Sequence, residues 1–146
     1  MTHRKLHHCL CAIIVLLLAF IWGNSTLSGE ESGAISSGLL AWLTEHVPLL
    51  ENMPELVLRK LGHVSEFAAL GFFLGLYFRN QQGYHRITMP LLMGFAAADI
   101  DELIQVFVPK RGPSVVDVWI DMGGLCAGLL VAQLLLGIRK LVKKKS

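Results

Sequence analysis

Four apolar segments, each close to the length needed to cross a bilayer, constrain this chain more than any other feature. They cover residues 6–22, 61–78, 87–108 and 115–138, and a helix needs about 20 residues to span the hydrocarbon core. Backbone groups inside a bilayer must form their hydrogen bonds within the protein, so helices are expected rather than open strands. The sequence therefore predicts an all-α, integral membrane bundle of four transmembrane helices.

The composition agrees with one small membrane domain. Of the 146 residues, 53% are hydrophobic and 16% are charged, which is more apolar than an ordinary soluble domain. The three cysteines lie in apolar runs, and the sequence contains no Cys-x-x-Cys pair and no Cys/His spacing typical of zinc. We therefore assign no metal ligand, and the cofactors are unknown at this point.

The chain divides into four parts. Residues 1–23 hold the first transmembrane helix, with a cleaved signal peptide as the alternative. We expect the helix to be retained because no convincing cleavage site follows it. Residues 24–57 form an extracytoplasmic loop, in which SGLLAWLTEHV predicts a short interfacial helix capped by Ser37, with an irregular loop as the alternative. Residues 58–138 form a three-helix core, and residues 139–146 form a basic cytoplasmic tail.

Basic residues set the expected orientation. Arg4 and Lys5, the loop between Arg79 and Arg86, and the basic tail all fall on one side of a four-span chain, which is therefore the cytoplasmic side. Both termini are expected there. A basic tail after an apolar helix suits an anionic lipid surface, so we expect membrane lipids as partners and no nucleic acid.

Polar residues of the second, third and fourth segments fall at one depth in this topology, in the outer leaflet. We call them the polar cluster and expect them to line an outward-facing pocket between these three helices. Its members are Lys60, His63, Glu66, Asp101, Glu102, Gln105, Arg111, Asp117 and Asp121. Charged groups in membrane helices cost about 2.5–3.5 kcal/mol each on insertion scales, which makes such a cluster a functional-site hypothesis.

Helical geometry aims the acidic groups of the cluster inward. At about 100° per residue, Asp101 shares a face with small residues one and two turns before it, and Asp121 shares a face with Gly124 and Gly128. Small residues let helix backbones approach closely. The carboxylates are therefore expected to face one another, while Asp99 projects away from the Asp101 face.

The polar residues also form an ordered set of motifs, which lies within residues 58–130. The motifs are Arg59-Lys60-x-x-His63-x-x-Glu66, Asp101-Glu102-x-x-Gln105, and Arg111-x-x-Ser114-x-x-Asp117 followed by Asp121 and Gly124. This set resembles the VanZ-like family of small bacterial membrane proteins. The resemblance implies a helical protein of the bacterial cytoplasmic membrane and a link with resistance to glycopeptide antibiotics. Where the family commonly has Asn, this chain has the additional carboxylate of Asp121.

Our functional hypothesis is a protein that binds or acts on a cell-envelope component, such as the head group of a lipid-linked or cell-wall precursor. Arg111 and Lys60 suit a phosphate or carboxylate, and histidine beside a carboxylate can transfer protons. The candidate catalytic residues are His63, Glu66, Asp101 and Glu102. Whether the protein is an enzyme stays open.

Two other interpretations compete with this hypothesis. The polar cluster can be a purely structural clasp, in which Arg111 pairs with Asp117, and Lys60 or His63 pairs with Glu66. It can also belong to a small ion- or metal-translocating protein, although no matching relay lies in the cytoplasmic halves of the segments. The relay groups or ligands would then be His63, Glu66 and Asp101.

The predicted orientation is testable with a reporter that is active only in the cytoplasm. Fused after Ser146 or within residues 79–86, the reporter should be active, because basic residues flank these sites. Inserted near Glu45, it should be inactive. The opposite pattern would place the polar cluster in the inner leaflet.

Overall fold

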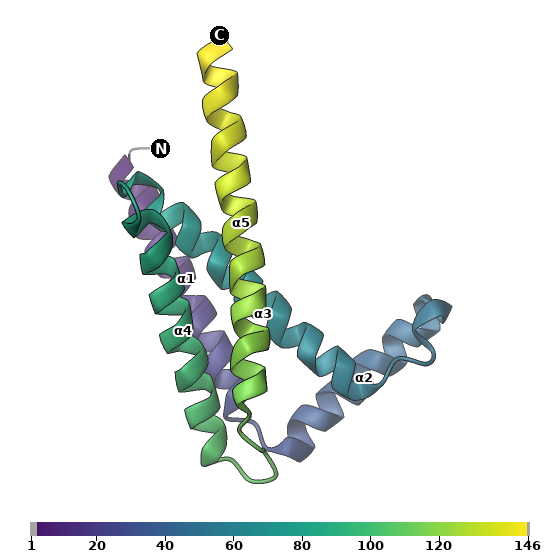
Figure 1. Cartoon of the computed structure of the whole chain (residues 1–146). Coiled ribbons are helices and arrows are strands. Elements are labelled where there is room, and N and C mark those ends of the chain that lie inside the picture. The colour runs from purple at the N-terminus through teal and green to yellow at the C-terminus, as the bar shows by residue number, and fades with distance from the viewer. Residues whose placement is uncertain (1–2, 146) are drawn as a thin grey trace.

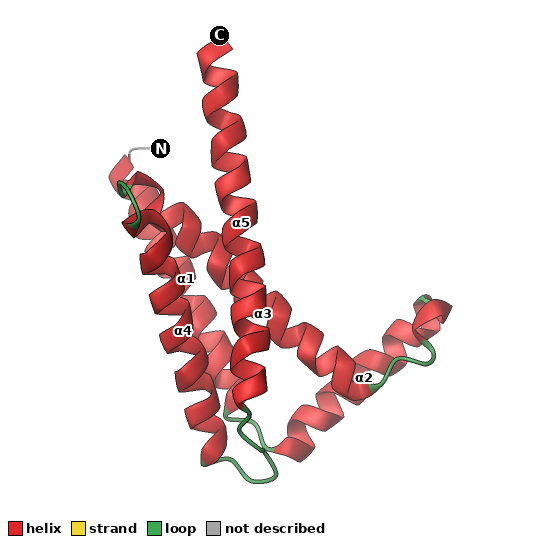
Figure 2. Cartoon of the chain, in the orientation of Figure 1, coloured by secondary structure: helices red, strands yellow, loops and turns green. Residues whose placement is uncertain are grey.

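The computed structural model describes residues 3–145, without the side chains at positions 3, 48, 139, 140 and 143–145. The α-helices of this part of the chain are α1 (His3–Ser25), α2 (Gly29–His46), α3 (Glu55–Tyr77), α4 (His85–Val106) and α5 (Val115–Lys145) (Figure 2). Short 3-10 turns, Pro48–Leu50 and Phe78–Asn80, follow α2 and α3, and residues 3–145 include no strand. The all-α prediction is confirmed.

Four of the helices, α1, α3, α4 and α5, form a bundle in which the chain passes back and forth. The start of α1 and the end of α5 lie toward the top of Figure 1, and the connections α1–α2 and α4–α5 lie together at the bottom. The helix α2 projects sideways from this lower end and contacts α3. The order of passes is therefore the one expected from the sequence, with α2 set apart from the bundle.

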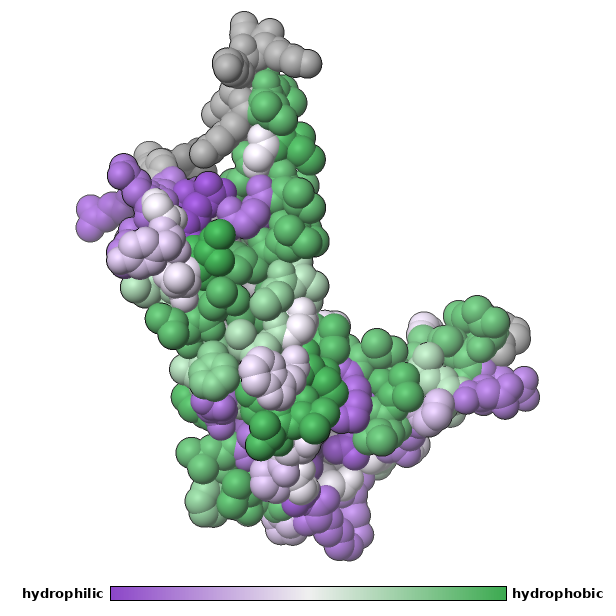
Figure 3. Space-filling view, viewed as in Figure 1, coloured by the Kyte–Doolittle hydropathy of each residue, from purple (hydrophilic) through white to green (hydrophobic). Residues whose placement is uncertain are grey.

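Three of the bundle helices are long and apolar enough to cross a membrane. These stretches are Arg4–Ser25, Glu55–Asn80 and Val115–Ile138. Large side chains such as Leu16, Leu92 and Leu130 point outward from the bundle, and hydrophobic atoms cover much of the visible face of α5 in Figure 3. These features support a membrane protein. Helix α4 carries three carboxylates, and its crossing of a membrane stays a prediction.

The helix α2 is longer than the predicted interfacial helix and begins at another cap. Ser28 is the N-cap, not Ser37: the Ser28 Oγ accepts a hydrogen bond from the Glu31 amide at 3.2 Å, and a Glu31 carboxylate oxygen accepts one from the Ser28 amide at 2.9 Å. This reciprocal pair is a capping box. The sequence Ser28-Gly29-Glu30-Glu31 carries its signature, so the earlier start could have been predicted.

Two other boundaries also differ from the expected ones. Helix α3 begins at Glu55, directly after Pro54, so the expected boundary between residues 57 and 58 falls inside its first turn. Helix α5 continues without a break to Lys145. The residues expected to form a separate tail are therefore helical up to position 145, while Ser146 and the basic side chains of the tail lie outside the described part.

Close contact between the backbones of α3 and α5 holds the bundle together, and this is its most extensive helix pair. A Cβ atom added to Gly124 would overlap the carbonyl oxygen of Val64, and one added to Gly128 would overlap that of Ala68. Only glycine fits at such contacts, as expected for a Gly-x-x-x-Gly pair. Phe67, which is fully buried, lies in the core beside this contact.

We predict that Gly128→Ala lowers the stability of the bundle. The added methyl group would meet backbone atoms of α3, which cannot move aside unless the helices separate, and such overpacking costs about 1–3 kcal/mol. The measurement is the melting temperature in detergent. The matched control is Gly123→Ala, because a Cβ at Gly123 meets open space and alanine favours a helix by about 0.5–1 kcal/mol. Equal melting temperatures for the two variants would contradict the proposed close packing.

Candidate functional site

Asp101 lies at the centre of the polar cluster and is fully buried. Its Oδ1 accepts a hydrogen bond from the Ser25 hydroxyl at 2.5 Å, and its Oδ2 accepts one from the Gln105 amide at 3.1 Å. Gln105 stands one turn later on the same face of α4, whereas Ser25 ends α1. Helix α1 therefore supplies part of the site, which the sequence analysis had placed between α3, α4 and α5 alone.

His63 and Asp121 approach Asp101 from α3 and α5. The His63 Nδ1 lies 3.5 Å from the Asp121 Oδ1 and 3.9 Å from the Asp101 Oδ2. Asp121 is fully buried, and none of the described donors makes a hydrogen bond to either of its carboxylate oxygens. Three helices thus direct polar atoms to one point, as the helical faces predicted.

Two glutamates near Asp101, His63 and Asp121 accept hydrogen bonds from uncharged donors. A Glu66 carboxylate oxygen accepts a hydrogen bond from the Asn24 side chain at 2.8 Å. A Glu102 oxygen accepts one from the backbone amide of Ser114 at 2.6 Å, where α5 is about to begin. A carboxylate at the start of a helix is favoured by the exposed amides and the helix dipole. Glu102 therefore ties the end of α4 to the start of α5.

The ion pairs differ from those expected for a structural clasp. Asp117 pairs with Lys60 on α3 rather than with Arg111, and Glu66 bonds to Asn24 rather than to Lys60 or His63. Both pairings expected for the clasp are therefore wrong. Lys60 and Asp117 each lie near the end of their helix that faces the α4–α5 turn, so the two side chains meet across the α3–α5 contact.

Arg111 instead holds the end of α1. Its Nε donates to the carbonyl of Leu27 at 3.1 Å and its Nη2 donates to the carbonyl of Asn24 at 3.2 Å. Partial burial, together with repulsion from Arg59, lowers the pKa of the Arg111 guanidinium, which nevertheless stays charged because arginine is not deprotonated in proteins. The guanidinium thus compensates the carbonyl end of the α1 dipole.

The turn before α5 explains why Arg111 points to α1. Lys110 has a φ of 59°, in the left-handed region, which reverses the chain direction within the turn. The amide of Gly29 donates to the carbonyl of Pro109 at 3.1 Å, and the absence of a side chain at Gly29 leaves room for the Lys110 backbone. The α1–α2 and α4–α5 connections are therefore joined backbone to backbone.

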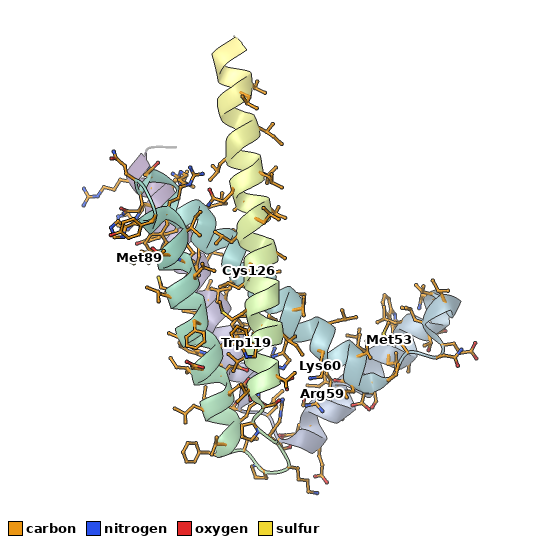
Figure 4. The ribbon with its side chains drawn as sticks, in the orientation of Figure 1. Met53, Arg59, Lys60, Met89, Trp119 and Cys126 are labelled. Carbon is orange, nitrogen blue, oxygen red and sulfur yellow. The ribbon has the colours of Figure 1, made fainter. Side chains whose placement is uncertain are left out.

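A cavity of about 210 Å³ opens between α3, α5 and the α4–α5 turn, and we call it the cationic cavity. Its lining includes the cations Arg59, Lys60, Lys110 and Arg111, together with His63, Gln105, Asp117 and Asp121. Figure 4 shows Arg59 and Lys60 on the lower part of α3, toward the beginning of α5. Within residues 3–145 no ion pair involves Arg59, so its charge is available to a ligand.

A second cavity, of about 410 Å³, lies between α1, α2 and α3, and we call it the apolar cavity. Its apolar lining consists of Phe20, Leu27, Ile35, Leu39 and Leu58. Glu66 also lines it, whereas Asp101 and Glu102 belong to neither lining. The two cavities share Arg59, His63 and Arg111, so a single molecule can contact both.

Sequence reasoning missed four residues that the structure brings to this region. Asn24 and Ser25 lie just after the first apolar segment, at the depth of the polar cluster, and this position was the signal that could have identified them. Arg59 belongs to the first motif, and Lys110 precedes Arg111 in the turn. Lys110 forms an exposed ion pair with Glu30, which links the α4–α5 turn to the start of α2.

Together, the helices and their buried carboxylates define a small helical membrane protein with a polar site at one end of the bundle. A model of the VanZ/LLP1 family matches residues 8–136, and the chain therefore belongs to this family. The match confirms the resemblance found within residues 58–130 and extends it through α1 and α2. No curated protein and no solved structure matches the chain.

We predict that Arg111→Lys destabilises the protein although it preserves the charge. A lysine cannot reproduce the fork that holds two carbonyls, and the loss of a charged hydrogen bond costs about 1.5–3 kcal/mol. The measurement is the melting temperature of the variant and of the parent protein in detergent. The neighbouring Lys110→Gln is the control, because exposed ion pairs contribute only about 0–1 kcal/mol. An Arg111→Lys protein as stable as the parent would show that α1 does not need this cap.

Proposed function

We propose that this protein binds an anionic, lipid-linked component of the bacterial cell envelope at the outer surface of the cytoplasmic membrane. The observation that carries the proposal is the junction of the cationic and apolar cavities at Arg59, His63 and Arg111. A phosphate-bearing head group and a hydrocarbon chain need opposite surroundings, and these two cavities provide them side by side.

The charge of the cationic cavity favours an anion. Lys60 is compensated by Asp117, and Lys110 by Glu30. Arg111 bonds to uncharged carbonyls, and Arg59 takes part in no ion pair among the described residues. Two guanidinium groups without a carboxylate partner therefore border the cavity, and guanidinium groups bind phosphate and carboxylate in two-pronged fashion.

The apolar cavity favours a ligand with a hydrocarbon chain over a soluble anion. Its apolar side chains come from α1, the α1–α2 connection, α2 and α3, and pockets for apolar groups are typically lined in this way. In the orientation expected from the basic residues, both cavities face outward. Lipid-linked precursors of the cell wall combine a phosphate with a long hydrocarbon chain and so fit this arrangement.

A structural clasp accounts for only part of the polar cluster. Neutral donors bond to Asp101, to Glu66 and to one oxygen of Glu102, but they do not explain why Arg59 borders a cavity without an ionic partner among the described residues. Membership of the VanZ/LLP1 family supports the envelope component as ligand, and the expected cellular effect is a change in susceptibility to glycopeptide antibiotics.

We predict that the purified protein binds a prenyl phosphate more tightly than the matching prenyl alcohol, as measured by native mass spectrometry in nanodiscs. Arg59→Gln should weaken binding of the phosphate by about tenfold or more, because a charged hydrogen bond contributes about 1.5–3 kcal/mol. Binding of the alcohol should hardly change, because it depends on the apolar cavity.

The matched control is Arg79→Gln, since Arg79 lies at the opposite end of α3 and bonds to the Leu76 carbonyl. The melting temperature of each variant separates binding from stability. Equal affinity of the parent for phosphate and alcohol, or equal effects of the two arginine variants, would argue against the proposal. Loss of binding only in step with loss of stability would favour the clasp.

A further inference from the structure

We propose that His63, Asp101 and Asp121 bind a divalent metal ion, with zinc as the best match. The three residues come from α3, α4 and α5, and each offers a ligand atom within 4.8 Å of the others. His63 and Asp121 also line the cationic cavity, so the ion would lie at its inner end. This inference goes beyond head-group binding and does not depend on it.

Asp121 provides the independent sign of a ligand. Its side chain is fully buried, and within residues 3–145 neither carboxylate oxygen receives a hydrogen bond. The His63 Nδ1 is likewise buried and makes no hydrogen bond there. The imidazole of His63, 3.5 Å from Asp121, is charged only when protonated, and a buried carboxylate that receives no hydrogen bond is destabilising. The atoms that face one another here are therefore arranged for a positively charged group.

The charges of the three residues match a divalent ion. Two carboxylates and a neutral imidazole carry two negative charges, and protonation of His63 would compensate only one of them. The ammonium group of Lys60, which lines the same cavity, is already paired with Asp117. A divalent cation balances both carboxylates and leaves the imidazole neutral, which is the form in which histidine binds metals.

The two distances from His63 come close to those of a zinc site, and all three ligand atoms lie within 4.8 Å of one another. Ligand atoms about 2.1 Å from a tetrahedral zinc ion lie roughly 3.4 Å from one another. The His63 Nδ1 lies 3.5 Å from the Asp121 oxygen and 3.9 Å from the Asp101 oxygen. Three protein ligands leave one coordination position, which is typical of zinc sites that bind an exchangeable ligand.

Ser25 and Gln105 would support the metal site from behind. Their hydrogen bonds to the two oxygens of Asp101 fix the orientation of that carboxylate, as outer partners of metal ligands commonly do. The mixture of one imidazole and two carboxylates favours zinc, with manganese as a weaker competitor, over magnesium, which prefers oxygen ligands and bound water.

The test is a titration of the full chain with ZnCl₂ after treatment with a chelator, with no lipid phosphate added. A background in which Cys9, Cys11 and Cys126 are replaced by Ser removes exposed thiols that would compete for zinc, and purification must avoid a histidine tag. We expect about one tightly bound zinc per chain by elemental analysis. Asp121→Asn and His63→Gln should each weaken binding by about 100-fold or more, and Ser25→Ala by about tenfold.

The matched control is Asp99→Asn, two residues before Asp101 on α4, because the Asp99 side chain is exposed and lines neither cavity. This variant should retain full zinc affinity. Should the ligand variants fail to fold, Co²⁺ binding to the parent gives a second readout, because ligation by the site should produce the visible absorption of four-coordinate Co²⁺. The proposal is overturned if the parent binds no zinc, if Asp121→Asn and His63→Gln bind zinc like the parent, or if Co²⁺ gives only the spectrum of the hydrated ion. Because prenyl phosphate is absent, these outcomes are independent of the head-group proposal.

Discussion

The close approach of α3 and α5 is the contact on which the site depends. Gly124 and Gly128 let the two backbones touch at Val64 and Ala68. His63 stands directly before Val64, and Asp121 stands about one turn before Gly124, so the same contact sets their separation of 3.5 Å. Side chains larger than hydrogen at the glycines would move the helices apart and with them the imidazole and the carboxylate. The geometry of the polar site therefore depends on the glycine packing motif.

Uncharged donors, rather than cations, bond to three acidic groups of the site, while one oxygen of Glu102 and both oxygens of Asp121 receive no hydrogen bond from the described residues. Ser25 bonds to Asp101, Asn24 to Glu66, and the backbone amide at Ser114 to Glu102. Such donors lower the cost of burying a carboxylate without cancelling its charge. The interior of the bundle thus keeps a negative character, while the arginines border the cavities. This separation of charge lets one end of a small bundle present both an acidic interior and a cationic entrance.

Side-chain positions could be predicted from the sequence where the helical period determines them. They could not be predicted where they depend on the conformation of a turn. The 100° rotation per residue correctly placed Asp101, Gln105 and Asp121 inside and Asp99 outside. It could not place Arg111, whose direction depends on the left-handed conformation of Lys110, a conformation that non-glycine residues adopt rarely. The contribution of α1 was missed for another reason: Asn24 and Ser25 read as ordinary helix-end residues until a carboxylate 76 positions away from Ser25 is found beside them.

The hydrogen bond between Ser25 and Asp101 joins two residues that are made at different times, because a chain is synthesised from its N-terminus. Ser25 ends α1 and is therefore synthesised 76 residues before Asp101, the carboxylate to which it donates. Helix α4 is the bundle helix that lies outside the set apolar enough to span by composition alone. One donor to Asp101 is therefore made before α4, whereas the donor to Glu102, the Ser114 amide, is made after it. The burial of Asp101 depends on the earliest helix, and the burial of Glu102 depends on the latest.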